Sequence, residues 1–552
     1  MNKTAVTLIL VFISLIASPF IIGFFKLPPE TYSLPFYGLS SLLRMSIAFI
    51  LSLVFAFFYG YYAATNKIGE KILIPLLDVL QSVPVLGFFP AAIAFFILFF
   101  NGSSVGVEIA AIFLIFTSMA WNIAFAVYES IKTIPQELSE AVSLFGLNNW
   151  QKFLKLYLPA SIPKTVYNGI LSWSAGWYFL VACEIISLGS QTYSLPGIGS
   201  FLVNVASKGD FTGLILGLAF LVLIIFAFNF LVWQPLSVWS EKFKYEEVSY
   251  STQETLWSSF FKSFPFFITI KGRAMQALEL AYSFFYKLSN PFRKFYFTHV
   301  ENKIPLIKKI IFYLLALTFL YLLIELLLFF AGIFSSTLPP DSSLIPESLL
   351  LSLARLVVSF ILTCFITIPL GIYVGLNGSK KLLYFFEALS AIPATALFPV
   401  IILIVSAFTS FEFSVILLIL TGMMWYVFFN VVAGVASIPQ DFKDVKKVFG
   451  LNLKSYLSKI VIPAMMPSFI TGSITAFGGG WNALIVAEYV NFGGKILKVN
   501  GIGSLIDISV YSSNNVKLLA LSLLAMTLFI IILNTLVWKK LYKWAFKHYS
   551  MN

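Results

Sequence analysis

Long apolar segments alternate with short polar ones along most of the chain. Runs of about 20 residues, the length that a helix needs to cross a bilayer, occur near 5–25, 41–65, 73–100, 107–129, 165–188 and 211–235, and again near 309–334, 349–376, 383–407, 412–435, 468–490 and 516–538. A polar, aromatic and basic stretch separates the two sets. The pattern predicts an all-α polytopic membrane protein with about twelve transmembrane helices in two six-helix halves.

The first apolar run, preceded by Lys3, could also be a signal peptide. Its length suits a complete span, however, and Pro-Phe-Ile-Ile stands where a small-residue cleavage site would end a signal peptide. We therefore expect it to be retained as the first helix.

Composition agrees with a membrane protein, because 59% of the residues are hydrophobic and only 11% are charged, against about 25% charged in an average soluble domain. With the N-terminus inside, most lysines and arginines fall in inner loops, the linker and the C-terminal tail. This bias predicts a multi-pass protein of the plasma or inner membrane with both termini in the cytoplasm. It also accounts for the net charge of +12 without a nucleic-acid partner.

The two halves match each other in sequence. SLLRMSIAFIL at 41–51 corresponds to SLARLVVSFIL at 352–362, and GWYFLVACE at 176–184 to GWNALIVAE at 480–488. Gly-Ile-Gly-Ser follows in both halves at the same spacing. Chance similarity would not place Gly, Trp and Glu at one offset twice, so we infer an internal duplication. We expect repeats at 1–235 (core about 41–235) and 309–552 (core about 349–538), with a cytoplasmic or interfacial linker at 236–308.

Two related polar segments precede the fifth apolar run of each half. They read EAVSLFGLNNWQKFLKLYLPASIP at 140–163 and DVKKVFGLNLKSYLSKIVIPAMMP at 444–467. Each pattern predicts a short amphipathic helix, a glycine break, a second short helix and a proline that opens the next span. An ordinary cytoplasmic loop is the plainer interpretation of one copy. Two copies with the same Gly and Pro positions favour a projecting element for docking.

These segments resemble the EAA loop of binding-protein-dependent ABC transporter permeases. The residues that carry the resemblance are Glu140, Ala141, Gly146, Leu158 and Pro159 in the first copy, and Asp444, Gly450, Ile462 and Pro463 in the second. The second copy departs from the pattern, with Asp for Glu and Val-Lys for Ala-Ala. Other motifs make the chain similar to a duplicated, fused permease of the nitrate, sulfonate and taurine branch.

The resemblance implies a function for the whole chain. It implies the permease of an ABC importer, which passes a small solute, with an anion such as nitrate or a sulfonate as the expected substrate. The paired loops would then couple it to cytoplasmic ABC ATPases, two in number, and an extracytoplasmic solute-binding protein would deliver the solute. The sequence has no Gly-x(4)-Gly-Lys-Ser/Thr phosphate loop. We therefore expect no enzyme activity and no cofactor in this chain, with ATP used by the partner subunits.

Charged residues inside the predicted spans are candidates for function. The equivalent positions of the two halves supply Arg44, Trp177 and Glu184, and Arg355, Trp481 and Glu488. Each Glu follows its Trp by seven residues and shares its helix face. One interpretation makes these residues a translocation path or gate. The other makes each Glu an outer-end residue in a hydrated vestibule, paired with Arg44 or Arg355.

Two other classes of protein fit parts of this sequence less well. An ion- or proton-coupled secondary transporter also suits twelve spans in two repeats, but it leaves the paired polar segments unexplained. A membrane enzyme would need a cluster of catalytic or metal-binding groups. The two cysteines, Cys183 and Cys364, and the two histidines, His299 and His548, are too scattered for a metal site or a disulfide framework.

Overall fold

The computed structural model describes residues 29–243 and 337–549 with short internal gaps, and a few single residues between 317 and 332. The predicted run at 5–25 lies outside the described residues. The run at 309–334 and the linker beyond 243 lie almost wholly outside them. Each half is described from its second predicted run onward.

The first half is built of helices that follow most of the predicted runs. They are η1 (Pro29–Ser33), α3 (Leu34–Thr65), α4 (Lys67–Ser82), η2 (Val85–Phe88), α6 (Ser104–Lys132), α7 (Gln136–Leu144), α8 (Asn149–Lys152), η3 (Phe153–Tyr157), α9 (Leu158–Cys183), α10 (Ile198–Ser207), α11 (Phe211–Phe228), η4 (Asn229–Trp233), α12 (Gln234–Ser240) and η5 (Glu241–Phe243).

The second half repeats this order. Its helices are η6 (Pro340–Leu344), α16 (Ile345–Asn377), α17 (Lys380–Ser390), α18 (Ala394–Val405), α19 (Phe411–Ala436), α21 (Leu453–Tyr456), η7 (Leu457–Val461), α22 (Ile462–Glu488), α23 (Ile502–Tyr511), α24 (Val516–Leu533), η8 (Asn534–Trp538) and α25 (Lys539–Tyr549). Among the described residues, seven helices are long and apolar enough to cross a membrane. The predicted total of twelve spans is therefore not confirmed.

The third predicted span of each half is broken, where the sequence pattern predicts one continuous helix. In the first half α4 ends at Ser82, and Pro84 precedes the short helix η2. In the second half α17 ends at Ser390, and Pro393 precedes α18. Proline has no N–H to donate and disfavours the helical conformation of the residue before it. Hydropathy alone did not register these breaks because the residues around them are apolar.

Two short hairpins end the fifth helices and interrupt the otherwise helical fold. Strand β1 (Ile185–Leu188) pairs antiparallel with β2 (Gln191–Ser194), and β3 (Tyr489–Phe492) pairs with β4 (Lys495–Lys498). The predicted runs at 165–188 and 468–490 extended into these hairpins. Each hairpin leads into a short helix, α10 or α23.

Within each half, one central helix packs between two others. Helix α6 packs against α3 and α9, and α19 packs against α16 and α22. Small residues allow the close approach: a Cβ on Gly60 would lie 2.8 Å from the Ala124 carbonyl oxygen, and one on Gly371 would lie 2.8 Å from Val431. Close backbone approach at small residues is typical of packed transmembrane helices.

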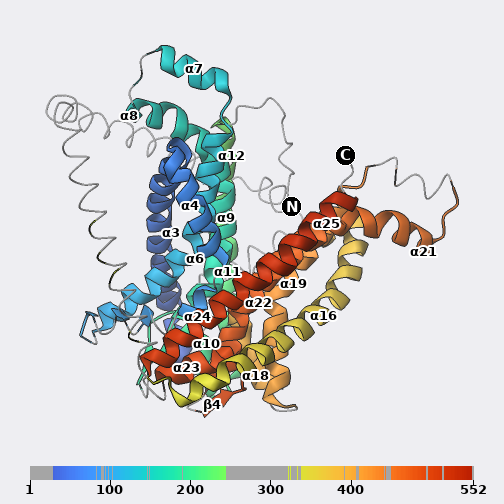
Figure 1. Ribbon diagram of the computed structural model, residues 1–552. Coiled ribbons are helices and arrows are strands. Elements are labelled where there is room, and N and C mark those ends of the chain that lie inside the picture. The colour runs from blue at the N-terminus through green and yellow to red at the C-terminus, as the bar shows by residue number, and fades with distance from the viewer. Residues whose placement is uncertain are drawn as a thin grey trace, which may run out of the picture.

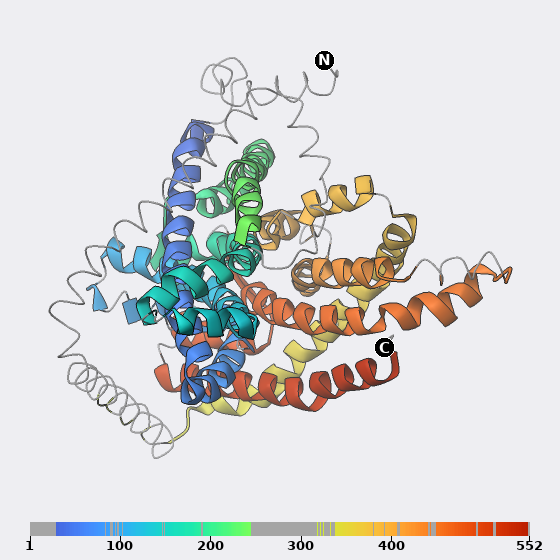
Figure 2. The ribbon, with the colours of Figure 1, turned by 90° about the horizontal axis from the view of Figure 1, so that it is seen from above.

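The two halves meet through their broken third segments. Helix α18 lies against α9 and α10 of the first half, and η2 lies against α22 of the second. Figure 1 shows the halves in contact at the end that carries α10, α18 and α23, and diverging toward α7 and α21. In Figure 2, turned by 90°, the blue to green helices of the first half gather on one side and the orange helices of the second half extend away on the other.

Candidate functional site

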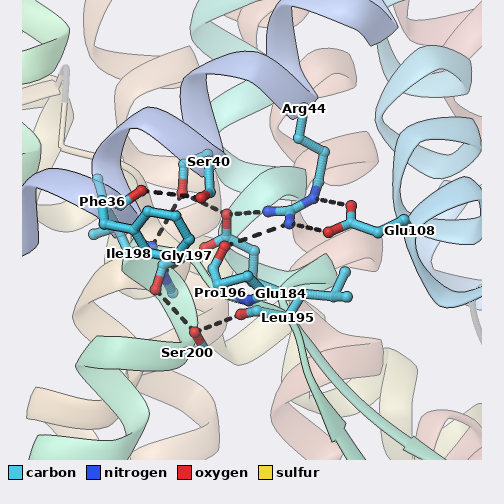
Figure 3. Close-up of polar contacts among 12 residues, drawn as sticks. Phe36, Ser40, Arg44, Glu108, Glu184, Leu195, Pro196, Gly197, Ile198 and Ser200 are labelled. Atoms are coloured by element: carbon cyan, nitrogen blue, oxygen red, sulfur yellow. Dashed lines mark hydrogen bonds and ion pairs between the residues drawn. The ribbon is translucent and has the colours of Figure 1, made fainter. Parts of the chain in front are cut away.

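A buried ion cluster lies at the C-terminal end of α9 in the first half. Glu184 follows the last residue of α9, and its side chain has no exposed surface. Its Oε1 accepts hydrogen bonds from Arg44 Nη1 at 2.7 Å and from Ser41 Oγ at 2.5 Å, and its Oε2 accepts one from the Gly199 N–H at 2.6 Å (Figure 3). The carboxylate therefore joins α3, α9 and α10 through charged and neutral donors.

Arg44 is held from its other side by Glu108, at the start of α6. Arg44 Nε and Nη2 each donate to one oxygen of Glu108 at 2.8 Å (Figure 3). This is the two-pronged pairing that suits a guanidinium and a carboxylate. Glu108 is 38% exposed whereas Arg44 is 3% exposed. Our sequence interpretation missed Glu108, although Glu412 stands at the equivalent place in the second half.

The second half repeats the cluster contact for contact. Glu488 accepts from Arg355 Nη1 at 2.8 Å, from Ser352 Oγ at 2.6 Å and from the Gly503 N–H at 2.8 Å. Arg355 also donates to both oxygens of Glu412, at 2.5 Å and 3.2 Å. The Arg–Glu pairing that the sequence left open is present in both halves. Glu184 and Glu488 are enclosed by protein, so neither carboxylate lies in a hydrated vestibule.

The Gly-Ile-Gly motif is required by these carboxylates. A Cβ on Gly197 would lie 2.1 Å from the carboxyl carbon of Glu184, and a Cβ on Gly501 would lie 2.2 Å from the oxygens of Glu488. Gly197 has an extended backbone with φ of −177°, so the glycine is needed for close approach and not for an unusual conformation. The repeated motif thus makes room for the buried acid.

Both predicted tryptophans lie inside the core of their own half. Trp177 is 1% exposed and Trp481 is 3% exposed. Trp177 belongs to the buried cluster that contains Met45 and Met119. The structure therefore brings each Arg and Glu together and places each Trp in the core beside them. Their role in a path or gate stays a prediction.

The first polar segment projects from its bundle. Helix α7 extends beyond the other helices (Figure 1), and the two apolar residues at its end, Leu144 and Phe145, are 88% and 80% exposed. Glu140 is exposed and accepts a hydrogen bond from Gln136 Nε2 at 2.7 Å. The Ala141 carbonyl accepts from the Phe145 N–H at 3.1 Å. Gly146 lies outside the described residues.

The base of this segment is fixed to α3. The rings of Phe153 and Tyr157 lie 5.2 Å and 5.7 Å from the ring of Tyr61. A π turn over η3 then leads into α9, which begins at Leu158 and Pro159. The Leu158 N–H donates to the Phe153 carbonyl five residues earlier, and this wider turn accommodates the following proline, which has no N–H to donate. The segment is therefore anchored at one end and exposed at the other.

The second polar segment ends in the same way, although Asp444 lies outside the described residues. Phe449 is 73% exposed, and Gly450 has a φ of +59°, which favours glycine. The Asn452 side chain accepts from the Ser455 N–H at 2.8 Å and caps α21. A π turn over η7 leads into α22 at Ile462 and Pro463.

Comparison with known families gives two matches along the chain. The family described as "Binding-protein-dependent transport system inner membrane component" matches residues 53–234 and 367–538. The two matched regions together cover more than half of the chain, and each contains one ion cluster's Glu and one polar segment.

Individual relatives match over a shorter region. The chain is 34% identical over 144 residues to a bicarbonate transport system permease protein, CmpB, of Synechococcus elongatus (26% of this chain, 51% of the relative). It is 31% identical over 144 residues to a nitrate import permease protein, NrtB, of Leptolyngbya laminosa (26% and 50%). A putative ABC transporter permease protein, MJ0413, of Methanocaldococcus jannaschii is 30% identical over 144 residues (26% and 53%). The chain spans about half the length of the curated relatives it matches.

Proposed function

Because the chain belongs to the family of inner membrane components of binding-protein-dependent transport systems, we propose that it is the permease of an ABC importer. One chain with two copies of the permease domain supplies both halves of a translocation path for a small solute. The observation that carries the proposal is the pair of projecting segments, which expose Leu144 and Phe145 in the first and Phe449, beside the Gly450 turn, in the second. Such a surface suits docking to a partner.

The partners at these segments are two cytoplasmic ATPases. Phe145 and Leu144 on the first segment and Phe449 on the second are the exposed apolar contacts. Movement of the ATPases upon binding and hydrolysing ATP is transmitted through them to α9 and α22. The coupling residues that the sequence predicts, including Gly146 and Asp444, belong to the same two segments. The first segment, with Glu140 and Ala141, matches the family pattern more fully.

The solute is a small anion delivered by an extracytoplasmic binding protein. Relatives with 31% to 34% identity are named for bicarbonate and nitrate transport, so both anions are candidates here, together with sulfonates. The lysines of α25 at the C-terminus and those near α7 favour a cytoplasmic location for both termini and both projecting segments.

The two ion clusters act as a framework for the outer gate. Each buried Glu positions the hairpin and short helix that follow it, and α10 packs against α18 of the other half. In this role Arg44, Glu184, Arg355 and Glu488 hold the gate elements in place, and Trp177 and Trp481 fill the core behind them.

Affinity purification of the chain from the membranes of its own host tests the proposal. We expect an ABC ATPase to copurify, and its ATP hydrolysis to fall in the Phe145→Asp and Phe449→Asp variants because a buried charge would oppose docking. Lys208→Gln, at the opposite end of the molecule, is the matched control. Solute uptake that runs on an ion gradient and ignores both Phe substitutions would overturn the proposal in favour of a secondary transporter.

A further inference from the structure

Helices α9 and α22 each carry one exposed stripe along an otherwise enclosed surface. In α9 the exposed residues are Tyr167, Leu171 and Ser174, and the other residues of this helix are buried or half-buried. In α22, beyond its first residue, they are Thr471, Thr475 and Gly478. The spacing of four and then three residues places each set on one helix face. The two sets occupy equivalent positions of the duplicated sequence.

Each stripe ends at a contact with the other half. The next residue on the α9 face is Tyr178, whose carbonyl accepts a hydrogen bond from Thr395 Oγ1 of α18 at 2.8 Å. The next on the α22 face is Asn482, whose Oδ1 accepts from the Leu86 N–H of η2 at 3.2 Å. Each stripe therefore faces the other half. The halves are in contact at the level of these hydrogen bonds, and Figure 1 shows α9 and α22 diverging beyond it.

The chemistry of the stripes differs from that of the exposed faces of α3 and α16. The exposed faces of α3 and α16 are apolar, with Leu43 and Ile50 on one and Ile361 and Phe365 on the other. The stripes instead include the hydroxyl groups of Ser174, Thr471 and Thr475, each of which is exposed and donates to the carbonyl four residues earlier in its own helix. Polar groups are unfavourable in hydrocarbon and in membrane proteins face the interior or a water-filled cavity. This contrast favours water over lipid beside the stripes.

The two stripes are not equivalent in size or polarity. The α9 stripe presents bulky side chains, with Tyr167 63% exposed and Leu171 48% exposed. The corresponding α22 positions carry Thr471 and Thr475. A Cβ added to Gly478 would meet nothing within 4 Å, so the space beside α22 is open. The α9 stripe therefore presents bulky side chains, whereas the α22 stripe presents hydroxyl groups beside open space.

We propose that the two stripes line the solute chamber and that the α22 stripe is its specificity-determining face. This deepens the proposed importer function and rests on it. The stripe positions carry no charged side chain, and Arg44 and Arg355 are engaged by their own glutamates. A small anion in this chamber therefore meets hydroxyl groups and not an ion pair, and Thr471 and Thr475 donate to it only by turning away from the carbonyls of their own helix, which they bond in its absence. Such binding is weak, which permits release toward the cytoplasm.

A buried hydroxyl lies where α9 packs against the core of the second half. Tyr178 Oη is buried and has no hydrogen-bond partner among the described residues. Asn482 stands at the equivalent place on α22, and its side-chain oxygen accepts a hydrogen bond from the Leu86 N–H.

Thiol labelling tests the chamber without any transport. In a chain with Cys183→Ala and Cys364→Ala, cysteine is introduced by Thr475→Cys or Leu171→Cys, with Ile361→Cys as the lipid-facing control. In inside-out vesicles, an anionic, membrane-impermeant thiosulfonate should modify the two stripe cysteines at least about tenfold faster than the control, because only water admits the reagent. Equal rates at the three positions would overturn the proposal.

Solute uptake tests the specificity face. The complex with its ATPase and binding protein, in proteoliposomes, is supplied with radiolabelled bicarbonate or with nitrate. Thr475→Val should raise the KM for uptake severalfold, and Gly478→Trp should abolish uptake while leaving the thermal unfolding midpoint unchanged. Ile361→Trp is the matched control. Unaltered uptake in both stripe variants would contradict the proposal, whereas ion-driven uptake by the parent chain would overturn the importer function and leave the labelling result standing.

Discussion

The two halves of the molecule agree in their buried ion clusters and differ on the faces that they present to each other. Glu184 and Glu488 each accept hydrogen bonds from an arginine, a serine and a glycine N–H, at distances that differ by at most 0.2 Å between the halves. Tyr167 and Thr471, in contrast, occupy equivalent exposed positions with unlike side chains. A buried carboxylate needs every partner, whereas an exposed position tolerates many residues.

The buried ion clusters form a framework that is the same in both halves, whereas the exposed faces of α9 and α22 differ. Duplication gave both halves the same buried ion cluster. Each cluster holds the hairpin and the short helix that follow it at the interface between the halves. The path-facing surface needs only to be open and of suitable polarity, so the halves could diverge there. The chain can thus present one wall and one hydrogen-bonding face within a symmetric framework.

Removal of the buried carboxylate should have the largest effect and should be equal in the two halves. Glu184→Ala or Glu488→Ala leaves an arginine buried without its partner, which costs about 3–5 kcal/mol in comparable buried pairs. Thermal unfolding of the purified protein in detergent measures the loss. Glu140→Ala, on the exposed surface of α7, serves as the control. A loss confined to one half would break the equivalence of the two clusters.

A methyl group in the Gly-Ile-Gly motif should have the next largest effect. Gly197→Ala and Gly501→Ala place a Cβ against the carboxylate, and overpacking of this kind costs about 1–3 kcal/mol. The same unfolding measurement applies. Gly478→Ala, which meets open space, should cause no loss and gains up to about 1 kcal/mol of helix propensity. Destabilisation by Gly478→Ala as great as by Gly197→Ala would contradict the assigned packing.

The two projecting segments should differ in how strongly they couple the chain to its ATPase. Phe145→Asp should lower ATP hydrolysis by the complex more than Phe449→Asp does, because the first segment carries the fuller family pattern. The rate of phosphate release at saturating ATP is the measurement. A larger effect of Phe449→Asp would reverse the expected order of the two segments.

The smallest effect concerns an ion pair of the first half, where Lys132 and Tyr128 both donate to Glu70. The equivalent of Lys132 in the second half is Ala436. The hydrogen bond from Lys132, followed by that from Tyr128, lowers the pKa of Glu70. A lowered folded-state pKa contributes stability above the unfolded pKa, and this is lost as the pH falls through the folded value.

Glu70→Gln should therefore lower the unfolding temperature slightly at pH 7 and leave it unchanged in strong acid, where the parent carboxylate is protonated. The measurement is a series of unfolding midpoints from pH 7 downward. A difference between parent and variant that stays constant over the whole series would show that the ionised carboxylate is not the cause.

The sequence predicted the features that depend on hydropathy and on repeated spacing. The duplication and most described spans agree with the structure, and Arg44 and Arg355 do pair with the predicted glutamates. The breaks near Pro84 and Pro393 were missed because apolar residues continue across them. Glu108 and Glu412 were missed because one acid near a helix start is ordinary, and only their contact with the arginines reveals their role.

The exposed stripes were also beyond the sequence pattern. Thr475 or Ser174 in an apolar helix can face a neighbouring helix, lipid or water, and hydropathy does not distinguish these environments. Their exposure depends on how the halves diverge, which is a tertiary property. The contacts of Tyr178 and Asn482 with the opposite half show which way the equivalent positions on α9 and α22 face.

Uptake by proteoliposomes tests the central claim most directly. The vesicles hold the chain with its copurified ATPase, and they are supplied with the binding protein and with radiolabelled bicarbonate or nitrate. The account predicts accumulation that requires both ATP on the ATPase side and the binding protein on the other. Accumulation that proceeds without ATP and follows an imposed ion gradient would contradict it.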